Sequence, residues 1–262
     1  KYTFFSLAAL ELPRQINWSP DVIHANDWHT ALSVYASLTK RWEAGARHVA
    51  SVVTLHNLPY MGPDVSAILE SYGIKLAQTD LPEWARLMPL PLGLWASDAI
   101  VAVSPTYAND VLTPDYGCGL DEFLQLRRET ISGILNGIDV VSFNPADDSA
   151  LGANFDIDSL EKRASNKTLL QERLGFQPDP EAPLLAIVSR MDAQKGVDLA
   201  LTALKSMKKV NFQAVILGTG DPKLEEAAQN LHNLFPEKIK VELRYDAGLA
   251  RHRSVEVPAV DR

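Results

Sequence analysis

The feature that most constrains this chain is a regular alternation of short apolar segments with amphipathic helices. Segments of buried-strand length, rich in β-branched residues, predict strands at 22–25, 49–55, 99–103, 134–135, 184–188, 214–217 and 239–243. Apolar residues at helical spacing predict helices between them, at 31–42, 160–174, 197–204 and 224–235. Because such alternation places helices on both faces of parallel sheets, the sequence predicts an α/β fold.

Two local patterns refine this picture. The chain opens inside a predicted amphipathic helix whose apolar face would hold Phe4, Phe5, Leu7 and Ala8. A hydroxyl followed by proline at Ser104-Pro105 is typical of a helix start.

The alternation is interrupted between residues 144 and 183. This segment holds a polar loop, one predicted helix and a proline-rich stretch at 177–181. We therefore expect two α/β domains, residues 1–145 and 183–262, joined by an interdomain segment at 146–182.

Composition excludes several classes of partner. A net charge of −8 disfavours nucleic acid and anionic membranes as partners. Cys118 is the only cysteine, which rules out a disulfide framework within the chain and fits a reducing compartment. The chain holds no run of about 18 to 20 apolar residues and no signal-peptide pattern. A cytoplasmic location is expected for a bacterial protein, or a plastid location for a plant protein.

Polar turns follow the first two predicted strands, where open α/β sheets bind ligands. The turn at 24–29 contains Asp27, which either caps the next helix or contacts a ligand. The turn at 54–57 contains His56, whose imidazole can bond a sugar hydroxyl or a leaving group, or can be structural.

Two further turns follow strands of the second domain. Arg190 and Lys195 provide two cations in an acidic protein, which suits a diphosphate, although a solvated basic loop is the alternative. Gly218 and Gly220 would let a ligand approach a helix N-terminus. The third glycine of a dinucleotide fingerprint is missing, so a nicotinamide enzyme is disfavoured.

An Asp-x-Asp pattern at 156–158 has the form of a metal-binding motif of another glycosyltransferase class. Its place in a polar loop before a predicted helix favours a helix start instead. We expect no metal and no cofactor.

Taken in order, these motifs resemble the family of bacterial glycogen synthases and plant starch synthases. The similarity extends from about residue 20 to about residue 250. The matching stretches are PDVIHANDWHT at 20–30, TLHNL at 54–58, VSPTYA at 103–108, GILNGID at 133–139, SR with QKG at 189–196, and LGTGDP at 217–222.

The resemblance implies two Rossmann-like domains of the GT-B type, with the acceptor side in the first and the nucleotide in the second. It implies transfer of glucose from ADP-glucose, or UDP-glucose, to the non-reducing end of an α-1,4-glucan with retention of configuration. By this match, catalytic roles fall to Asp27, His56, Arg190 and Lys195. Donor contacts also include Asn136, Gly218, Gly220 and Tyr245, and the acceptor and sugar region also includes Trp28, His29 and Asn57.

The sequence also departs from the family pattern. The family has a Lys-Thr-Gly-Gly-Leu loop that closes on the donor phosphates and a Glu-Pro-Cys-Gly-Leu segment with an essential glutamate. Neither occurs in these 262 residues, and residues 251–262 diverge from the family. We therefore expect an internal fragment with both domains incomplete, truncated or frameshifted at its end, that does not transfer glucose alone.

Two other functions are weighed against this one. A neighbouring retaining transferase, of the sucrose synthase or trehalose-phosphate synthase type, shares the architecture, but the two histidine-containing turns favour the glucan enzymes. A non-catalytic α/β module that binds only nucleotide or glucan is the alternative from a different class.

Overall fold

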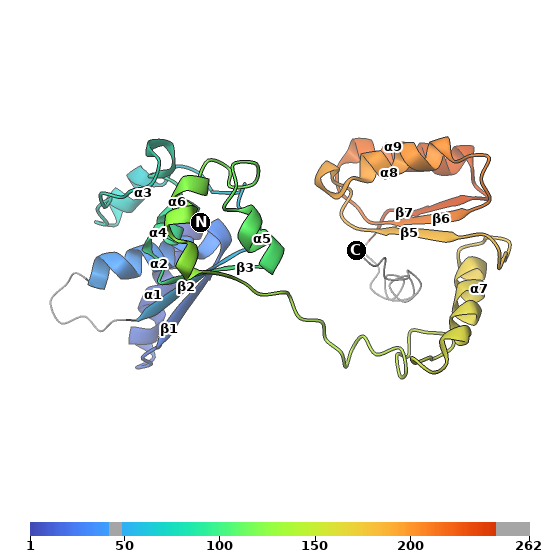
Figure 1. Ribbon diagram of the computed structural model, residues 1–262, viewed down its shortest axis with the longest axis horizontal. Coiled ribbons are helices and arrows are strands. Elements are labelled where there is room, and N and C mark those ends of the chain that lie inside the picture. The colour runs from blue at the N-terminus through green and yellow to red at the C-terminus, as the bar shows by residue number, and fades with distance from the viewer. Residues whose placement is uncertain (42–48, 245–262) are drawn as a thin grey trace. The chain divides into compact units, whose positions relative to one another are not determined.

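The computed structural model describes residues 1–41 and 49–244, which form two compact units, Lys1–Gly137 and Ile138–Arg262 (Figure 1). Each unit contains a parallel β-sheet with helices, which confirms the predicted α/β class. The domain limits expected at residues 145 and 182 stay predictions. Within the described residues, no helix is long and apolar enough to cross a membrane.

In the first unit, the sheet has the order β1-β2-β3-β4, and each neighbouring pair is parallel. Its strands are β1 (Val22–Asn26), β2 (Ala50–Leu55), β3 (Ala99–Ala102) and β4 (Ile131–Gly133). Its α-helices are α1 (Tyr2–Gln15), α2 (Asp27–Arg41), α3 (Ser66–Ser71), α4 (Pro89–Ala96), α5 (Pro105–Asp110) and α6 (Asp121–Leu126). Short 3₁₀ turns lie at Glu83–Ala85 (η1) and Arg128–Thr130 (η2).

The core of this unit centres on the packing of α2 against α4. Gly93 of α4 lies so close to Ala31 that an added Cβ would come within 2.6 Å of the alanine Cβ. Tyr35 of α2 is fully buried, and its hydroxyl donates to Lys75 O at 3.2 Å and accepts from Ala77 N at 2.7 Å. The close helix contact fixes the start of α2, where the polar turn after β1 lies.

Two local predictions were wrong in detail. The helix at the start of the chain forms, but Phe4 and Phe5 are 63% and 56% exposed, while Thr3 and Ser6 are buried. The reason is that α1 packs on α2 through its small polar side, where Ser6 donates to His29 O at 3.2 Å.

The fourth strand lies at 131–133 and not at the predicted 134–135. Gly133 has no room for a Cβ, because the backbone of Ser104 and Pro105 lies against it. Ile134 still donates its N–H to Ala102 O at 2.9 Å, but the chain then leaves the sheet, so that Ile134 and Leu135 are exposed. The position of the strand is therefore set by the start of α5.

The second unit contains the parallel sheet β5-β6-β7. Helices α8 and α9 lie side by side on one face, and α7 packs on the other through Leu170 and Leu174 against Leu184 and Leu217 (Figure 1). The elements are η3 (Leu160–Lys162), α7 (Arg163–Arg173), β5 (Leu184–Val188), η4 (Ala193–Lys195), α8 (Val197–Ser206), β6 (Gln213–Leu217), α9 (Pro222–Leu234) and β7 (Ile239–Glu242).

Hydrogen bonds hold the proline-rich stretch at 177–181 against other residues of the second unit. The carboxylate of Asp179 accepts from Glu181 N at 2.8 Å and from Asn211 Nδ2 at 3.1 Å. Gln171 of α7 donates to Asp179 O at 3.0 Å, and Lys167 donates to Pro180 O at 2.7 Å. These bonds make the stretch a structured entry to β5.

Candidate functional site

Asp27 connects the polar turns that follow β1 and β2. Its backbone has φ +51°, a left-handed conformation that costs a non-glycine residue about 1–2 kcal/mol. Its Oδ1 accepts hydrogen bonds from the backbone N–H of His56 at 2.8 Å and of Asn57 at 3.3 Å. The carboxylate therefore joins two turns that lie 29 and 30 residues apart in sequence. Strain of this kind concentrates at functional sites.

The imidazole of His56 is held from the neighbouring turn. Its Nε2 lies 3.1 Å from Oδ1 of Asn26, the last residue of β1. Because an amide oxygen only accepts, the ring donates from Nε2 in this contact. His56 is exposed, so the ring lies at the surface of this sheet edge.

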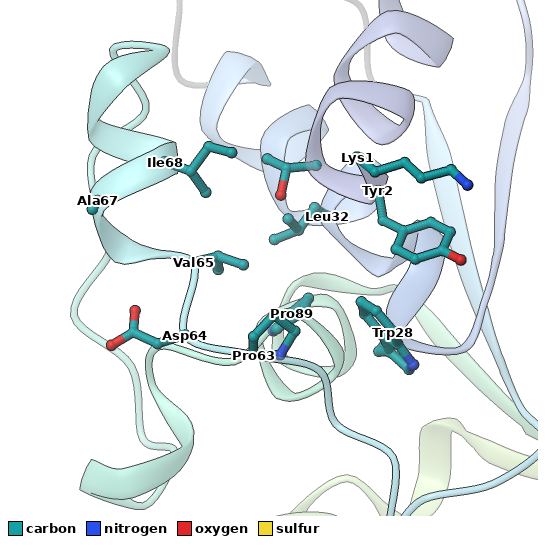
Figure 2. Close-up of a pocket in the computed structure, with 11 residues that line it drawn as sticks. Lys1, Tyr2, Trp28, Leu32, Pro63, Asp64, Val65, Ala67, Ile68 and Pro89 are labelled. Carbon is teal, nitrogen blue, oxygen red and sulfur yellow. The ribbon is translucent and has the colours of Figure 1, made fainter.

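Trp28 and His29 belong to an aromatic cluster beside this turn. The two rings lie 4.2 Å apart, and Tyr2 meets them edge-on at 4.9 and 4.8 Å. Trp28 also lines a pocket of about 330 Å³, in which Tyr2 and Trp28 lie on one side and Asp64 on the other (Figure 2). The indole therefore faces this pocket, whereas the His29 ring is packed by both neighbouring rings, Trp28 at an interplanar angle of 30° and Tyr2 at 82°.

Tyr107 of α5 supports the turn that follows β2, and the sequence analysis did not assign this residue a role. Its hydroxyl accepts from the backbone N–H of Leu58 at 2.9 Å. Burial raises the pKa of the Tyr107 phenol, and the bond from Leu58 opposes that rise. The helix start before it is confirmed, since Ser104 Oγ accepts from Tyr107 N at 2.9 Å. The motif at 103–108 could have pointed to Tyr107, because α5 directly follows β3 and therefore begins at the same edge of the sheet.

In the second unit, Arg190 and Lys195 lie at the carboxyl end of β5, and both are exposed. Within residues 1–41 and 49–244, neither side chain makes a hydrogen bond or an ion pair with another side chain or the backbone. Two exposed cations at a strand exit that no other described residue binds are available to an anionic ligand.

The glycine turn after β6 packs on the loop that carries Arg190. Met191 donates its N–H to Thr219 O at 2.9 Å, and a Cβ on Gly218 or on Gly220 would overlap the carbonyl of Ser189 or of Met191, respectively. These glycines are therefore required for the contact between the two loops. A role of Gly218 and Gly220 in ligand binding stays a prediction.

The N-terminus of α9 is closed by side chains of its own segment. Asp221 accepts from Lys223 N, and Glu225 accepts from Gly220 N, both at 2.7 Å. These bonds satisfy donors that would otherwise face a ligand.

The remaining predicted positions are less informative. Asn136 lies in the exposed stretch after β4, and Tyr245 lies outside the described residues.

Asp156 accepts from Ser159 Oγ at 2.7 Å and from Asp158 N at 3.1 Å, which forms a turn just before η3. This is the structural arrangement expected of a helix start. In the part of the chain that the structure describes, no group of three or more His, Cys, Asp or Glu residues is placed to hold a metal ion.

Comparison with known proteins gives a consistent result. Residues 1–126 match the family described as starch synthase catalytic domain. The glycogen synthase of Streptococcus gordonii is 36% identical over 96% of this chain and 54% of its own length. That of Lactiplantibacillus plantarum is 38% identical over 96% of this chain and 53% of its own.

Solved structures agree with the sequence comparison. The catalytic domain of starch synthase IV from Arabidopsis thaliana, bound to ADP and acarbose, superposes with a TM-score of 0.85 at 30% identity, covering 97% of this chain and 54% of that one. A glycosyltransferase from Rickettsia africae, at 18% identity and a TM-score of 0.51, shares the fold. The chain spans about half the length of the relatives it matches. The motifs, the parallel sheets and these likenesses agree, so the chain is similar to glycogen synthases and starch synthases over the half of their length that it spans.

Proposed function

We propose that this chain supplies acceptor- and donor-binding residues for the transfer of glucose from ADP-glucose to the non-reducing end of an α-1,4-glucan, with retention of configuration. The observation that carries the proposal is the strained Asp27, whose carboxylate organises the turn of His56 and Asn57. Relatives named glycogen synthase, and a structural neighbour bound to ADP and acarbose, support this substrate class. The cytoplasmic location expected of a bacterial member stays a prediction.

The first unit would bind the sugars. Asp27 holds two backbone N–H groups and thereby fixes the His56 ring, whose Nε2–H is oriented by Asn26. The exposed imidazole is then a preorganised partner for a hydroxyl of the donor glucose. Preorganisation matters because misplacement by about 1 Å can cost on the order of 10²-fold in rate.

The second unit would bind the diphosphate. Cleavage of a glycosyl-phosphate bond builds negative charge on the leaving group while the sugar becomes cationic. Preorganised cations aimed at that charge stabilise the transition state, and removal of one such group typically costs about 10²–10³-fold in rate. Arg190 and Lys195 are free for this role, since neither is engaged by another described residue.

The donor-site proposal is tested by calorimetry of ADP binding to the 262-residue chain. Arg190→Ala and Lys195→Ala are each expected to weaken ADP binding about tenfold, close to the loss of one charge-assisted hydrogen bond. Lys205→Ala is the matched control, because Lys205 is an exposed lysine in the last turn of α8. ADP affinity unchanged in both variants would contradict the assignment. UDP in place of ADP measures the base preference.

Turnover is tested separately. The purified 262-residue polypeptide is expected to incorporate no glucose from ADP-glucose into glycogen, because its sequence contains neither the Lys-Thr-Gly-Gly-Leu nor the Glu-Pro-Cys-Gly-Leu segment. Robust incorporation by this polypeptide would show that the donor and acceptor residues described above suffice without those segments.

A further inference from the structure

Helix α1 turns an apolar face outward. Thr3 and Ser6 are buried on the side that packs on α2, whereas an apolar stripe on the opposite side of the helix is exposed. At 3.6 residues per turn, the positions of this stripe fall within about 140° of arc, a width that a helix normally turns towards a core. The α1 stripe consists of Phe4, Phe5, Ala8, Ala9, Leu12 and, directly after the helix, Ile16.

The α1 stripe has no charged side chain and is bordered by polar ones. Lys1 and Gln15 lie at its two ends, and Glu11 and Arg14 lie along one side, where they form an ion pair at 3.4 Å. The whole chain carries a net charge of −8, so two copies repel each other over much of their surface. At the stripe, two copies can approach without opposing like charges.

The stripe is self-complementary when two helices run antiparallel. Ala8 and Ala9 lie at its centre, and the large side chains lie towards its ends. A two-fold axis between the two alanines would place Phe5 of one copy against Leu12 of the other. The alanines then let the two helices approach closely, while the large side chains fill the space on either side of them. Contacts of this isologous kind are the commonest way in which identical chains associate.

The exposed apolar area is sufficient for a weak dimer. Phe4 and Phe5 are 63% and 56% exposed, and Leu12 and Ile16 are 56% and 58% exposed. With about 150–250 Å² for each aromatic side chain and less for each aliphatic one, the stripe presents roughly 500 Å² in each copy. A pair would therefore bury roughly 1,000 Å², which is the lower limit for a specific interface.

We propose that two copies of this chain associate through antiparallel pairing of their α1 helices, with the two-fold axis between Ala8 and Ala9. The pairing buries an apolar patch that otherwise stays in water. It is independent of the proposed function, since the α1 stripe contains none of the donor or sugar residues named above.

The oligomeric state is measured by sedimentation velocity of the 262-residue chain. Between about 1 and 200 μM, the mass is expected to rise from that of one chain to that of two, with a Kd of about 10 μM because the interface is small. A chain that stays monomeric over this range would overturn the proposal.

Charge substitutions at the axis test the antiparallel arrangement. Ala8→Glu is expected to weaken association at least about tenfold, because it brings two carboxylates together at the centre of the interface. Ala8→Lys is expected to do the same, and an equimolar mixture of the two variants is expected to associate at least as well as the unmodified chain. The position is exposed, and both new residues favour helices, so α1 is expected to persist, which circular dichroism checks.

Two further variants complete the test. Phe5→Gln removes a large apolar contact without adding a charge, and it is expected to weaken association about tenfold. Ala203→Glu is the matched control, because Ala203 is an exposed alanine within α8 of the second unit. It is expected to leave association unchanged.

The outcomes separate this inference from the proposed function. Association that Ala8→Glu and Phe5→Gln leave unchanged would overturn the role of α1. Weakening by Ala8→Glu and by Ala8→Lys without recovery in their mixture would overturn the antiparallel register. ADP affinity is expected to be equal in the unmodified chain and in Ala8→Glu, so failure of ADP to bind would count against the proposed function and leave the pairing of α1 intact.

Discussion

Substitution of Asp27 separates the two structural roles given to this residue. Its carboxylate accepts from the N–H of His56 at 2.8 Å and, more weakly, of Asn57 at 3.3 Å, and its backbone lies at φ +51°. Asp27→Ala removes the acceptor and keeps a Cβ in the left-handed region. Asp27→Gly removes the acceptor but relieves the backbone, and Asp27→Asn keeps an acceptor oxygen and tolerates this region.

The expected magnitudes follow from these contacts. The shorter bond contributes about 1.5 kcal/mol, at the low end for a bond to a charged group, because the exposed His56 turn can exchange it for water. The left-handed backbone strains aspartate and alanine alike, so glycine relieves about 1 kcal/mol that alanine keeps, after allowance for the greater freedom of glycine in the unfolded chain. We therefore expect a loss of unfolding free energy of about 1.5 kcal/mol for Asp27→Ala, about 0.5 kcal/mol for Asp27→Gly and below about 1 kcal/mol for Asp27→Asn.

The assay is urea unfolding followed by tryptophan fluorescence. All five tryptophans belong to residues 1–137, so the signal reports the first unit and is not mixed with unfolding of the second; they are Trp18, Trp28, Trp42, Trp84 and Trp95. If Asp27→Ala is as stable as Asp27→Gly, the backbone at this position is not strained and the argument from φ is wrong. If Asp27→Asn loses as much unfolding free energy as Asp27→Ala, the stabilisation comes from the negative charge alone and not from the geometry of the hydrogen bond.

Three further predictions follow from the structure. Gly218→Ala should destabilise the second unit and weaken ADP binding, because its methyl group would overlap the carbonyl of Ser189 in the loop of Arg190; unchanged ADP affinity in calorimetry would refute it. Tyr107→Phe should lower the unfolding free energy of the first unit by about 1–3 kcal/mol in the fluorescence assay, because the N–H of the buried Leu58 loses its acceptor. Burial raises the pKa of the Cys118 thiol, so the alkylation rate should reach half its maximum at a higher pH than that of an unstructured cysteine peptide; an equal or lower midpoint would contradict the burial.

Much of the fold could be predicted because periodicity is a local property. The strands β5 and β6 and the helices α7 to α9 follow from apolar spacing that each segment carries in its own residues. The burial of α1 could not be predicted in this way. Apolar content suggested that Phe4 would face the core, yet Thr3 and Ser6 do, since the face that a helix buries depends on the neighbour it packs against.

The candidate site shows the same division. Turns that follow parallel strands meet at one edge of a sheet, so the sequence was sufficient to expect Asp27 and His56 near each other. It did not show that Asp27 binds the backbone of the His56 turn, nor that Gly218 serves a contact between two loops. Those facts depend on the dihedral angle of one residue and on atoms about 30 residues apart in sequence. Sequence pattern thus determined which segments form this protein's sheets, and only tertiary packing decided which atoms meet at their edges, because hydrogen bonds and steric contacts are set by distance in space.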